Sequence, residues 1–302
     1  MTNFRVFDDR FRALIDETQS FETLGEGFRF TEGATWHPKE GHVSFTDIPS
    51  SRIHRWHPAS GTMETLRDPS NMTNGTTYDH QGRLLMCEQE TSRVTRLEAD
   101  GAITVLADSW QGNELNSPND IVVDDQGAIW FTDPLYGRQS GTGVVRQPGL
   151  PFTGFFKIDP QGVLHLMADD YDGPNGLCFS ADKTRLYVND SEIEHIRVYD
   201  MGPDGSVTGG EIFALPYDDG TLDRGSPDGM KVDAAGNVWC TCPGGVQVFA
   251  PDGTALGAVL TPKQTANFCF GGDDLRTLYT CSQTAFYSIR LKQAGHAIYN
   301  PS

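Results

Sequence analysis

NDIVVDDQGAIWFTD (residues 119–133) contains two short apolar runs separated by the polar turn sequence DDQG. Each run has the length of a short strand, and Asp and Gly are common in tight hairpin turns. The stretch therefore predicts a β-hairpin. Related stretches occur five more times along the chain, and their regular spacing indicates an internal repeat.

The six copies begin at residues 32, 74, 119, 175, 228 and 267. Each of the first five is followed by two more strand-like runs, whereas the sixth is followed by one. Units of four short strands at this spacing are typical of β-propeller blades. The run FETLGEG (21–27) resembles METLRD (63–68) in the first unit, and it is predicted to supply the missing strand and close the ring. The sequence predicts an all-β, six-bladed β-propeller of four-stranded blades as one domain over 21–302, after an N-terminal extension of residues 1–20.

The composition narrows the classes of partner. The chain has 302 residues and a formal net charge of −18, which opposes nucleic acid or an anionic membrane as the main partner. It contains no apolar stretch of about 18 residues and no pattern of a secretory signal. We therefore expect a cytoplasmic protein with a small-molecule partner, and the sequence does not indicate its oligomeric state.

Six cysteines are scattered through the chain without a C-x-x-C pair. Most of them lie inside apolar strand patterns, so they are predicted to be buried free thiols rather than zinc ligands.

One position of the repeat carries an acid or an amide in every unit. Aligning the units makes these residues equivalent: Glu32, Asn74, Asn119, Asn175, Asp228 and Asn267. If they begin the innermost strands, all six side chains converge on one mouth of the central channel. Carboxylate and amide oxygens without His or Cys favour a hard divalent cation, Ca²⁺ first, with Mg²⁺, Mn²⁺ or Zn²⁺ as alternatives. The alternative interpretation is that these six residues only cap the turns that lead into the strands, since Asn and Asp often begin turns.

Four joined motifs give the chain a family resemblance. It resembles the gluconolactonase/regucalcin (senescence marker protein) family in EGATWHP, NSPNDIVVDDQGAIWFTDPLYG, GPNGLCFSADKTRLYVND and SPDGMKVDAAGNVW. The resemblance implies a six-bladed propeller with a divalent metal in its channel and hydrolysis of sugar lactones. It also implies that Glu32, Asn175 and Asp228 bind the metal and that Asn119 binds metal or substrate. Asp228 is then the candidate base.

Two local features favour one branch of that family. The animal regucalcin branch has Arg two positions before the third-blade Asn, where this chain has Ser117. The run FTDPLYG (131–137) is similar to the bacterial enzymes. The resemblance therefore implies the bacterial gluconolactonase branch.

A polyhydroxylated lactone also needs polar groups that bind its hydroxyls. The candidates are Asn74, Asn119, Asp133, Tyr136 and Asn267. For Asp133 and Tyr136, a structural role at the strand end is an equal alternative. The insertion at 137–152 is rich in Gly and Pro and follows a strand that ends at the same mouth, so it is a candidate lid or a disordered insertion.

Two other functions suit the same pattern. One is a metal-dependent phosphotriesterase or arylesterase on the same kind of site, and the other is a non-catalytic calcium-binding propeller. The fold alone does not decide among them.

Overall fold

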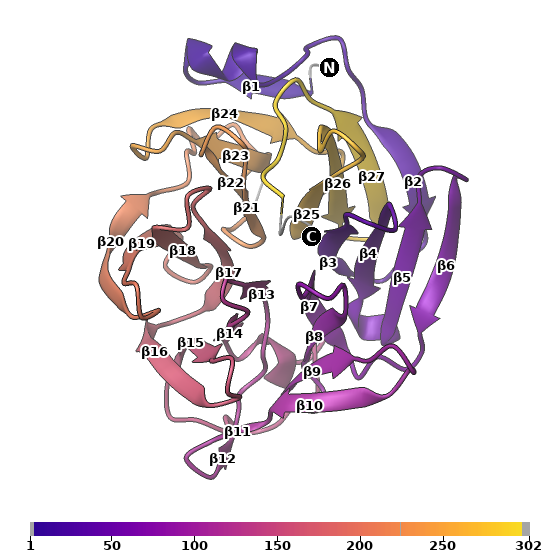
Figure 1. Cartoon of the computed structure of the whole chain (residues 1–302). Coiled ribbons are helices and arrows are strands. Elements are labelled where there is room, and N and C mark those ends of the chain that lie inside the picture. The colour runs from indigo at the N-terminus through magenta and orange to yellow at the C-terminus, as the bar shows by residue number, and fades with distance from the viewer. Residues whose placement is uncertain (1–2, 224, 298–302) are drawn as a thin grey trace.

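The computed structural model describes residues 3–223 and 225–297, and these residues form six antiparallel sheets around a central channel (Figure 1). From the channel outward, the first three sheets are β3 (Thr31–His37), β4 (His42–Asp47), β5 (Arg52–His57), β6 (Thr62–Arg67); β7 (Thr73–Tyr78), β8 (Leu84–Glu88), β9 (Arg93–Leu97), β10 (Ile103–Ala107); and β13 (Ile121–Val123), β14 (Ile129–Asp133), β15 (Thr153–Ile158), β16 (Leu164–Tyr171). The last three are β17 (Pro174–Phe179), β18 (Arg185–Asp190), β19 (His195–Met201), β20 (Val207–Ala214); β21 (Met230–Val232), β22 (Val238–Cys242), β23 (Gly245–Phe249), β24 (Ala255–Leu260); and β25 (Asn267–Gly271), β26 (Thr277–Ser282), β27 (Ala285–Arg290), β2 (Glu22–Glu26). The predicted six-bladed propeller is confirmed.

The N-terminal part of the chain closes the ring. β2 pairs antiparallel with β27, with Glu22 opposite Ser288 and Glu26 opposite Ala285. The sixth blade therefore takes its outer strand from the start of the chain, as the sequence predicted. This pairing covers an edge that would otherwise expose unpaired backbone groups.

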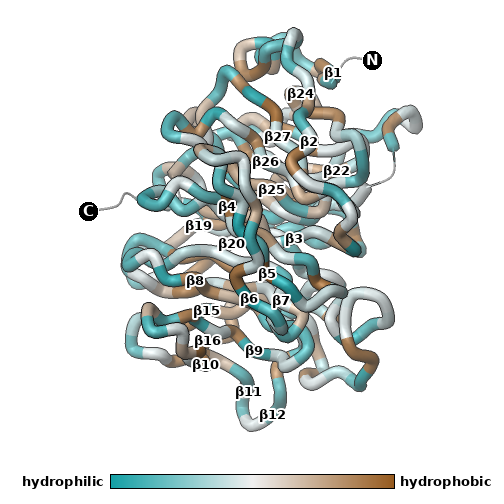
Figure 2. The backbone as a smooth tube through the Cα atoms, turned by 90° about the vertical axis from the view of Figure 1, so that its right-hand side faces the viewer, coloured by the Kyte–Doolittle hydropathy of each residue, from teal (hydrophilic) through white to brown (hydrophobic). Residues whose placement is uncertain are grey.

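The segment before β2 also packs on the ring. β1 (Phe4–Val6) pairs with β24 and makes the fifth blade five-stranded. The 3₁₀ helix η1 (Asp9–Ala13) follows it and buries Phe11 completely between the fifth and sixth blades. Figure 2 shows the sheets from the side, with β1 and β24 at one edge of the molecule and the small hairpin β11 (Ser109–Trp110)–β12 (Asn113–Glu114) at the other.

The core lies between neighbouring blades. Trp130 and Phe155 of the third blade pack with Leu177 and Val188 of the fourth in one buried cluster. Because both faces of a middle strand meet a neighbouring sheet, β22 and β8 are buried along their whole length. This explains why the strand patterns are continuous apolar runs rather than alternating ones.

Three further observations complete the fold. Two short 3₁₀ helices, η2 (Ile48–Ser50) and η3 (Tyr136–Arg138), follow the second strands of the first and third blades. All six cysteines are free and buried, as predicted. Within residues 3–223 and 225–297, no helix has the length and apolar character needed to cross a bilayer.

Candidate metal and substrate site

A cavity of about 540 Å³ opens at the end of the channel where the inner strands begin. Five of the six equivalent acid and amide residues line it, namely Glu32, Asn74, Asn119, Asn175 and Asp228. Asn119 and Asp228 lie two residues before the first residue of their inner strands, and each of the other three is the second residue of its strand. The repeat thus brings together side chains that are up to about two hundred residues apart in sequence.

Glycine allows neighbouring inner strands to approach closely at this end. A Cβ on Gly33 would lie 2.1 Å from the backbone oxygen of Asn74, and a Cβ on Gly176 would lie 2.0 Å from that of Asp228. Gly33 also has φ +59°, which disfavours other residues. At these two positions the glycine allows neighbouring blades to pack closely, while the residue before it, Glu32 or Asn175, lines the cavity.

Side chains of the second strands fix the backbone of the next blade's cavity residue. Asn189 Nδ2 donates to the backbone oxygen of Asp228 (2.5 Å), and Asn189 Oδ1 accepts from the N–H of Gly176 (3.1 Å). In the same way, Thr46 Oγ1 donates to the backbone oxygen of Asn74 at 3.0 Å. These buried contacts hold cavity residues of adjacent blades in a fixed relation.

Glu32 is a buried carboxylate with only 2% of its surface exposed. Its Oε2 accepts from the N–H of Gly33 (2.6 Å) and from Asn267 Nδ2 (2.9 Å). Burial raises the pKa of Glu32 to about 7, and these hydrogen bonds oppose the rise. A positive ion beside this carboxylate would therefore stabilise its charged form.

Asp228, which precedes the inner strand of the fifth blade, is half-buried and also lines the cavity. Burial, and then the charge of Glu32, raise the pKa of Asp228 well above its ordinary value. The charge of Asp120 adds to this effect. The sequence analysis did not single out Asp120, which does not line the cavity but is 3% exposed and has an Oδ2 without a partner among the described residues. Its position directly after Asn119 in the PND motif was the available signal.

Two amide oxygens at the cavity have no hydrogen-bond partner within residues 3–223 and 225–297. Asn175 donates from Nδ2 to Ser191 Oγ (2.9 Å), while its buried Oδ1 is unpaired, and the same holds for the buried Oδ1 of Asn74. In the described part of the chain, no group of three or more His, Cys, Asp or Glu side chains is arranged for a metal. Two carboxylates and two unpaired amide oxygens, however, are donors that fit an oxygen-preferring cation.

Two of the predicted substrate contacts lie behind the cavity wall. Asp133 is completely buried, and its oxygens accept from the backbone N–H groups of Asn116 (2.8 Å) and Ser117 (2.7 Å). Asn267 does not line the cavity but donates to Glu32. Both residues therefore support the site from outside it.

Tyr136 and the insertion that follows it form part of the cavity wall. Tyr136 lines the cavity, together with Gln139, Ser140 and Thr142. The start of the insertion is fixed to the connection between the second and third blades, because Arg138 Nε donates to the backbone oxygen of Asn116 at 2.6 Å. The structure describes all of residues 137–152. Three residues of this insertion line the cavity that it was expected to cover as a lid.

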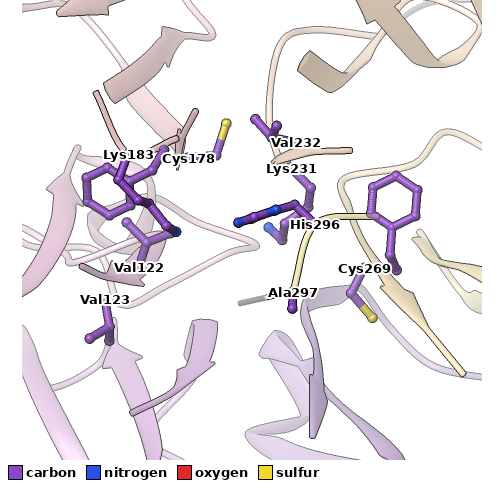
Figure 3. A pocket seen from close by; sticks show the side chains of 11 residues that line it. Val122, Val123, Cys178, Lys183, Lys231, Val232, Cys269, His296 and Ala297 are labelled. Carbon is purple, nitrogen blue, oxygen red and sulfur yellow. The ribbon is translucent and has the colours of Figure 1, made fainter. Parts of the chain in front are cut away.

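The other end of the channel has the opposite charge. A small cavity of about 70 Å³ lies there, and Lys183, Lys231 and His296 point into it (Figure 3). Burial lowers the pKa of Lys183 and of His296, and Lys183 adds to the shift of His296. The channel is thus acidic where the inner strands begin and basic where they end.

The fold and this cavity define a class of six-bladed propellers with a carboxylate–amide site at one channel mouth. Residues 30–284 match the family described as the SMP-30/Gluconolactonase/LRE-like region, and the chain belongs to that family. It is 28% identical to a gluconolactonase of Zymomonas mobilis over 96% of this chain and 86% of that protein. It is 30% identical to the pentonolactonase XacC of Haloferax volcanii over 83% of this chain and 80% of that protein. The solved structure of XC5397 from Xanthomonas campestris, a gluconolactonase, superposes with a TM-score of 0.87 at 32% identity, over 95% of this chain and 94% of that one.

Proposed function

We propose that this protein is a lactonase that hydrolyses sugar lactones with the help of one divalent cation, Ca²⁺ being the preferred ion and Mg²⁺, Mn²⁺ or Zn²⁺ the alternatives. The observation that carries the proposal is the unpaired Oδ1 of Asn175 in a cavity that also holds Glu32 and Asp228. The lactonases among the relatives support the choice of substrate.

The residues that would hold the ion are Glu32, Asn175 and Asp228, with Asn119 beside them. When bound, the cation supplies polarisation of the lactone carbonyl and stabilises the negative charge that develops on its oxygen. The carboxylates of Glu32 and Asp228 would balance the charge of a divalent ion in this cavity.

Asp228 is the proposed general base. Of the two carboxylates in this set it is the more exposed, since Glu32 is buried. The oxygen of a water molecule attacks the carbonyl carbon while Asp228 takes one of its protons, and the ring C–O bond then breaks. The proton passes to the alkoxide oxygen that leaves, so the product is the open hydroxy acid.

The cavity also provides groups that position the substrate. Asn74, Asn119 and Tyr136 present amide and phenol groups to it, which suits the hydroxyls of a polyol lactone. Asp133 and Asn267 take part indirectly, by holding the backbone before β13 and the carboxylate of Glu32. A cytoplasmic location stays a prediction.

The test is hydrolysis of a panel of aldonolactones by purified protein, first after chelation and then with each cation added back. We expect aldonolactone turnover that chelator abolishes and Ca²⁺ restores. Aryl esters and phosphotriesters belong in the panel, because faster turnover of either would favour the esterase alternatives. Cation binding without turnover of any substrate would support the non-catalytic calcium-binding propeller.

A further inference from the structure

We propose that Glu192 and Glu194 make the cavity selective for neutral lactones and exclude lactones that carry a phosphate or another anionic group. This inference rests on the proposed lactonase function. Both residues lie in the connection between β18 and β19, at the cavity mouth, and both line the cavity.

The charges of the cavity wall are all negative in the described structure. The wall includes the carboxylates of Glu32, Asp228, Glu192 and Glu194, and none of its described residues is Lys, Arg or His. A divalent cation held by Glu32 and Asp228 would be balanced by those two residues. The two glutamates at the mouth then leave an excess of negative charge that faces an entering substrate.

These two glutamates have no neutralising partner among the described residues. Both side chains are exposed, and no hydrogen bond or ion pair of either carboxylate is found among residues 3–223 and 225–297. Their backbone is fixed, because the N–H of Glu192 donates to Asp190 Oδ1 at 2.9 Å. Burial, followed by the charge of Glu192 among other causes, raises the pKa of Tyr136, which places this charge near a residue of the cavity wall.

The basic groups of the channel do not line the acidic cavity, although the charge of Lys231 opposes the raised pKa of Glu32 and of Asp120. Lys183, Lys231 and His296 converge on the small cavity at the opposite end (Figure 3). The bound lactone would occupy the acidic end, where an anionic substituent meets repulsion and finds no cationic partner in the described wall. At separations of about 8 Å and an intermediate effective dielectric, each such pair of charges is worth roughly five- to tenfold in binding.

The test compares kcat/KM for D-glucono-1,5-lactone and for its 6-phosphate in the Ca²⁺-loaded protein at low ionic strength. The ratio of the two values is measured for the parent, for Glu192→Gln, for Glu194→Gln and for the double variant. Glu211→Gln is the matched control, because Glu211 is an exposed carboxylate on the outer strand of the same blade, remote from the cavity. The Glu211→Gln variant changes the net charge of the protein by the same amount as each single mouth variant.

We expect the parent to prefer the neutral lactone by at least about 100-fold, and each mouth variant to raise the relative rate for the phosphate by about five- to tenfold. Salt should reduce the preference of the parent, since added ions screen exposed charges. Glu211→Gln should leave the ratio where it was. If the neutral lactone is hydrolysed but the ratio is insensitive to the mouth variants, this inference is overturned and the proposed function stands. If neither lactone is hydrolysed, both the proposed function and this inference are wrong.

Discussion

Asn189 connects two cavity residues of adjacent blades, since its Nδ2 donates to the backbone oxygen of Asp228 and its Oδ1 accepts from the N–H that follows Asn175. Asn189 is completely buried in the fourth blade. One side chain therefore sets the distance between two proposed cation ligands.

Replacing this residue tests its positioning role. Asn189→Ala should lower the affinity for Ca²⁺ by at least about tenfold and the free energy of unfolding by roughly 1–3 kcal/mol, because two buried backbone groups lose their partner. Isothermal titration and urea denaturation measure the two effects. The matched control is Asn237→Ala, which removes the buried bond to Asp233 Oδ2 (2.7 Å) near the other end of the channel. It should lose stability but keep the affinity. Equal losses of affinity in both variants would contradict the positioning role.

Asp228→Asn separates the roles of Asp228 as ligand and as base. It preserves the shape of the side chain but removes its charge and its ability to accept a proton. Turnover should fall by about 10² to 10⁴ even at saturating cation, since general base assistance is typically worth that much. Turnover measured across a cation titration decides the matter. Recovery to the parent level at high cation concentration would show that Asp228 is a ligand only.

Gly33→Ala tests the close contact between the first two blades. The added Cβ would lie 2.1 Å from the backbone oxygen of Asn74, so the inner strand must move and the site must widen. We expect a loss of stability of several kcal/mol together with weaker Ca²⁺ binding. Gly41→Ala is the control, because Gly41 has a similar φ of +65° but nothing within 4 Å of the added atom. It should cost only about 1 kcal/mol, and a similar cost for both variants would argue against the close contact.

The stability of the cation-free protein should depend on the ionisation of Asp133. Burial raises the pKa of Asp133 to about 7, although the N–H groups of Asn116 and Ser117 oppose the rise. Between about pH 4 and pH 7 the folded state therefore binds more protons at this residue than the unfolded chain does. Its contribution to stability is present in full below about pH 4 and is lost as the pH rises through about 7.

The pH effect can be isolated by comparison with Asp133→Asn. Relative to this variant, the free energy of unfolding of the parent should fall between pH 4 and pH 7, by an amount on the order of 4 kcal/mol at most, because one pKa unit corresponds to about 1.4 kcal/mol. Urea denaturation in chelator at a series of pH values measures the difference. A difference that is constant with pH would show that Asp133 is ionised throughout.

Deleting residues 1–28 should prevent normal folding. The deletion removes β2 from the edge of β27 and β1 from the edge of β24, and exposed strand edges promote aggregation. Light scattering and thermal denaturation report the result. Deleting only residues 1–7 removes β1 and leaves β2, so that variant should stay monodisperse with a lower melting temperature. An unchanged melting temperature in the longer deletion would show that β2 does not close the ring.

The sequence predicted the blades and the equivalent cavity residues because both are local and repeated. Each hairpin is encoded in about fifteen consecutive residues, and alignment of the repeats placed Asn119 and Asp228 at one channel mouth without any knowledge of contacts. The contribution of Asn189 was not predictable, because its partners belong to other strands and one belongs to the next blade. Asp133 shows a different limit: its polar side chain folds under the preceding loop rather than into the cavity, and that direction depends on backbone N–H groups that a sequence does not reveal. The pairing of β1 was missed because three residues are too few to show a strand pattern.

The closure of the ring by β2 has a consequence for how the chain is made. Glu22 is synthesised 266 residues before its partner Ser288. β2 must therefore stay unpaired while the strands of the first five blades are synthesised, and its pairing with β27 joins residues that are far apart in sequence. Contacts of such long sequence separation form slowly, because the entropy of closing the loop is lost before the contact is gained. We expect closure of the ring to be the last and slowest step of folding, and the nascent chain to depend on protection of β2 until β27 has been synthesised.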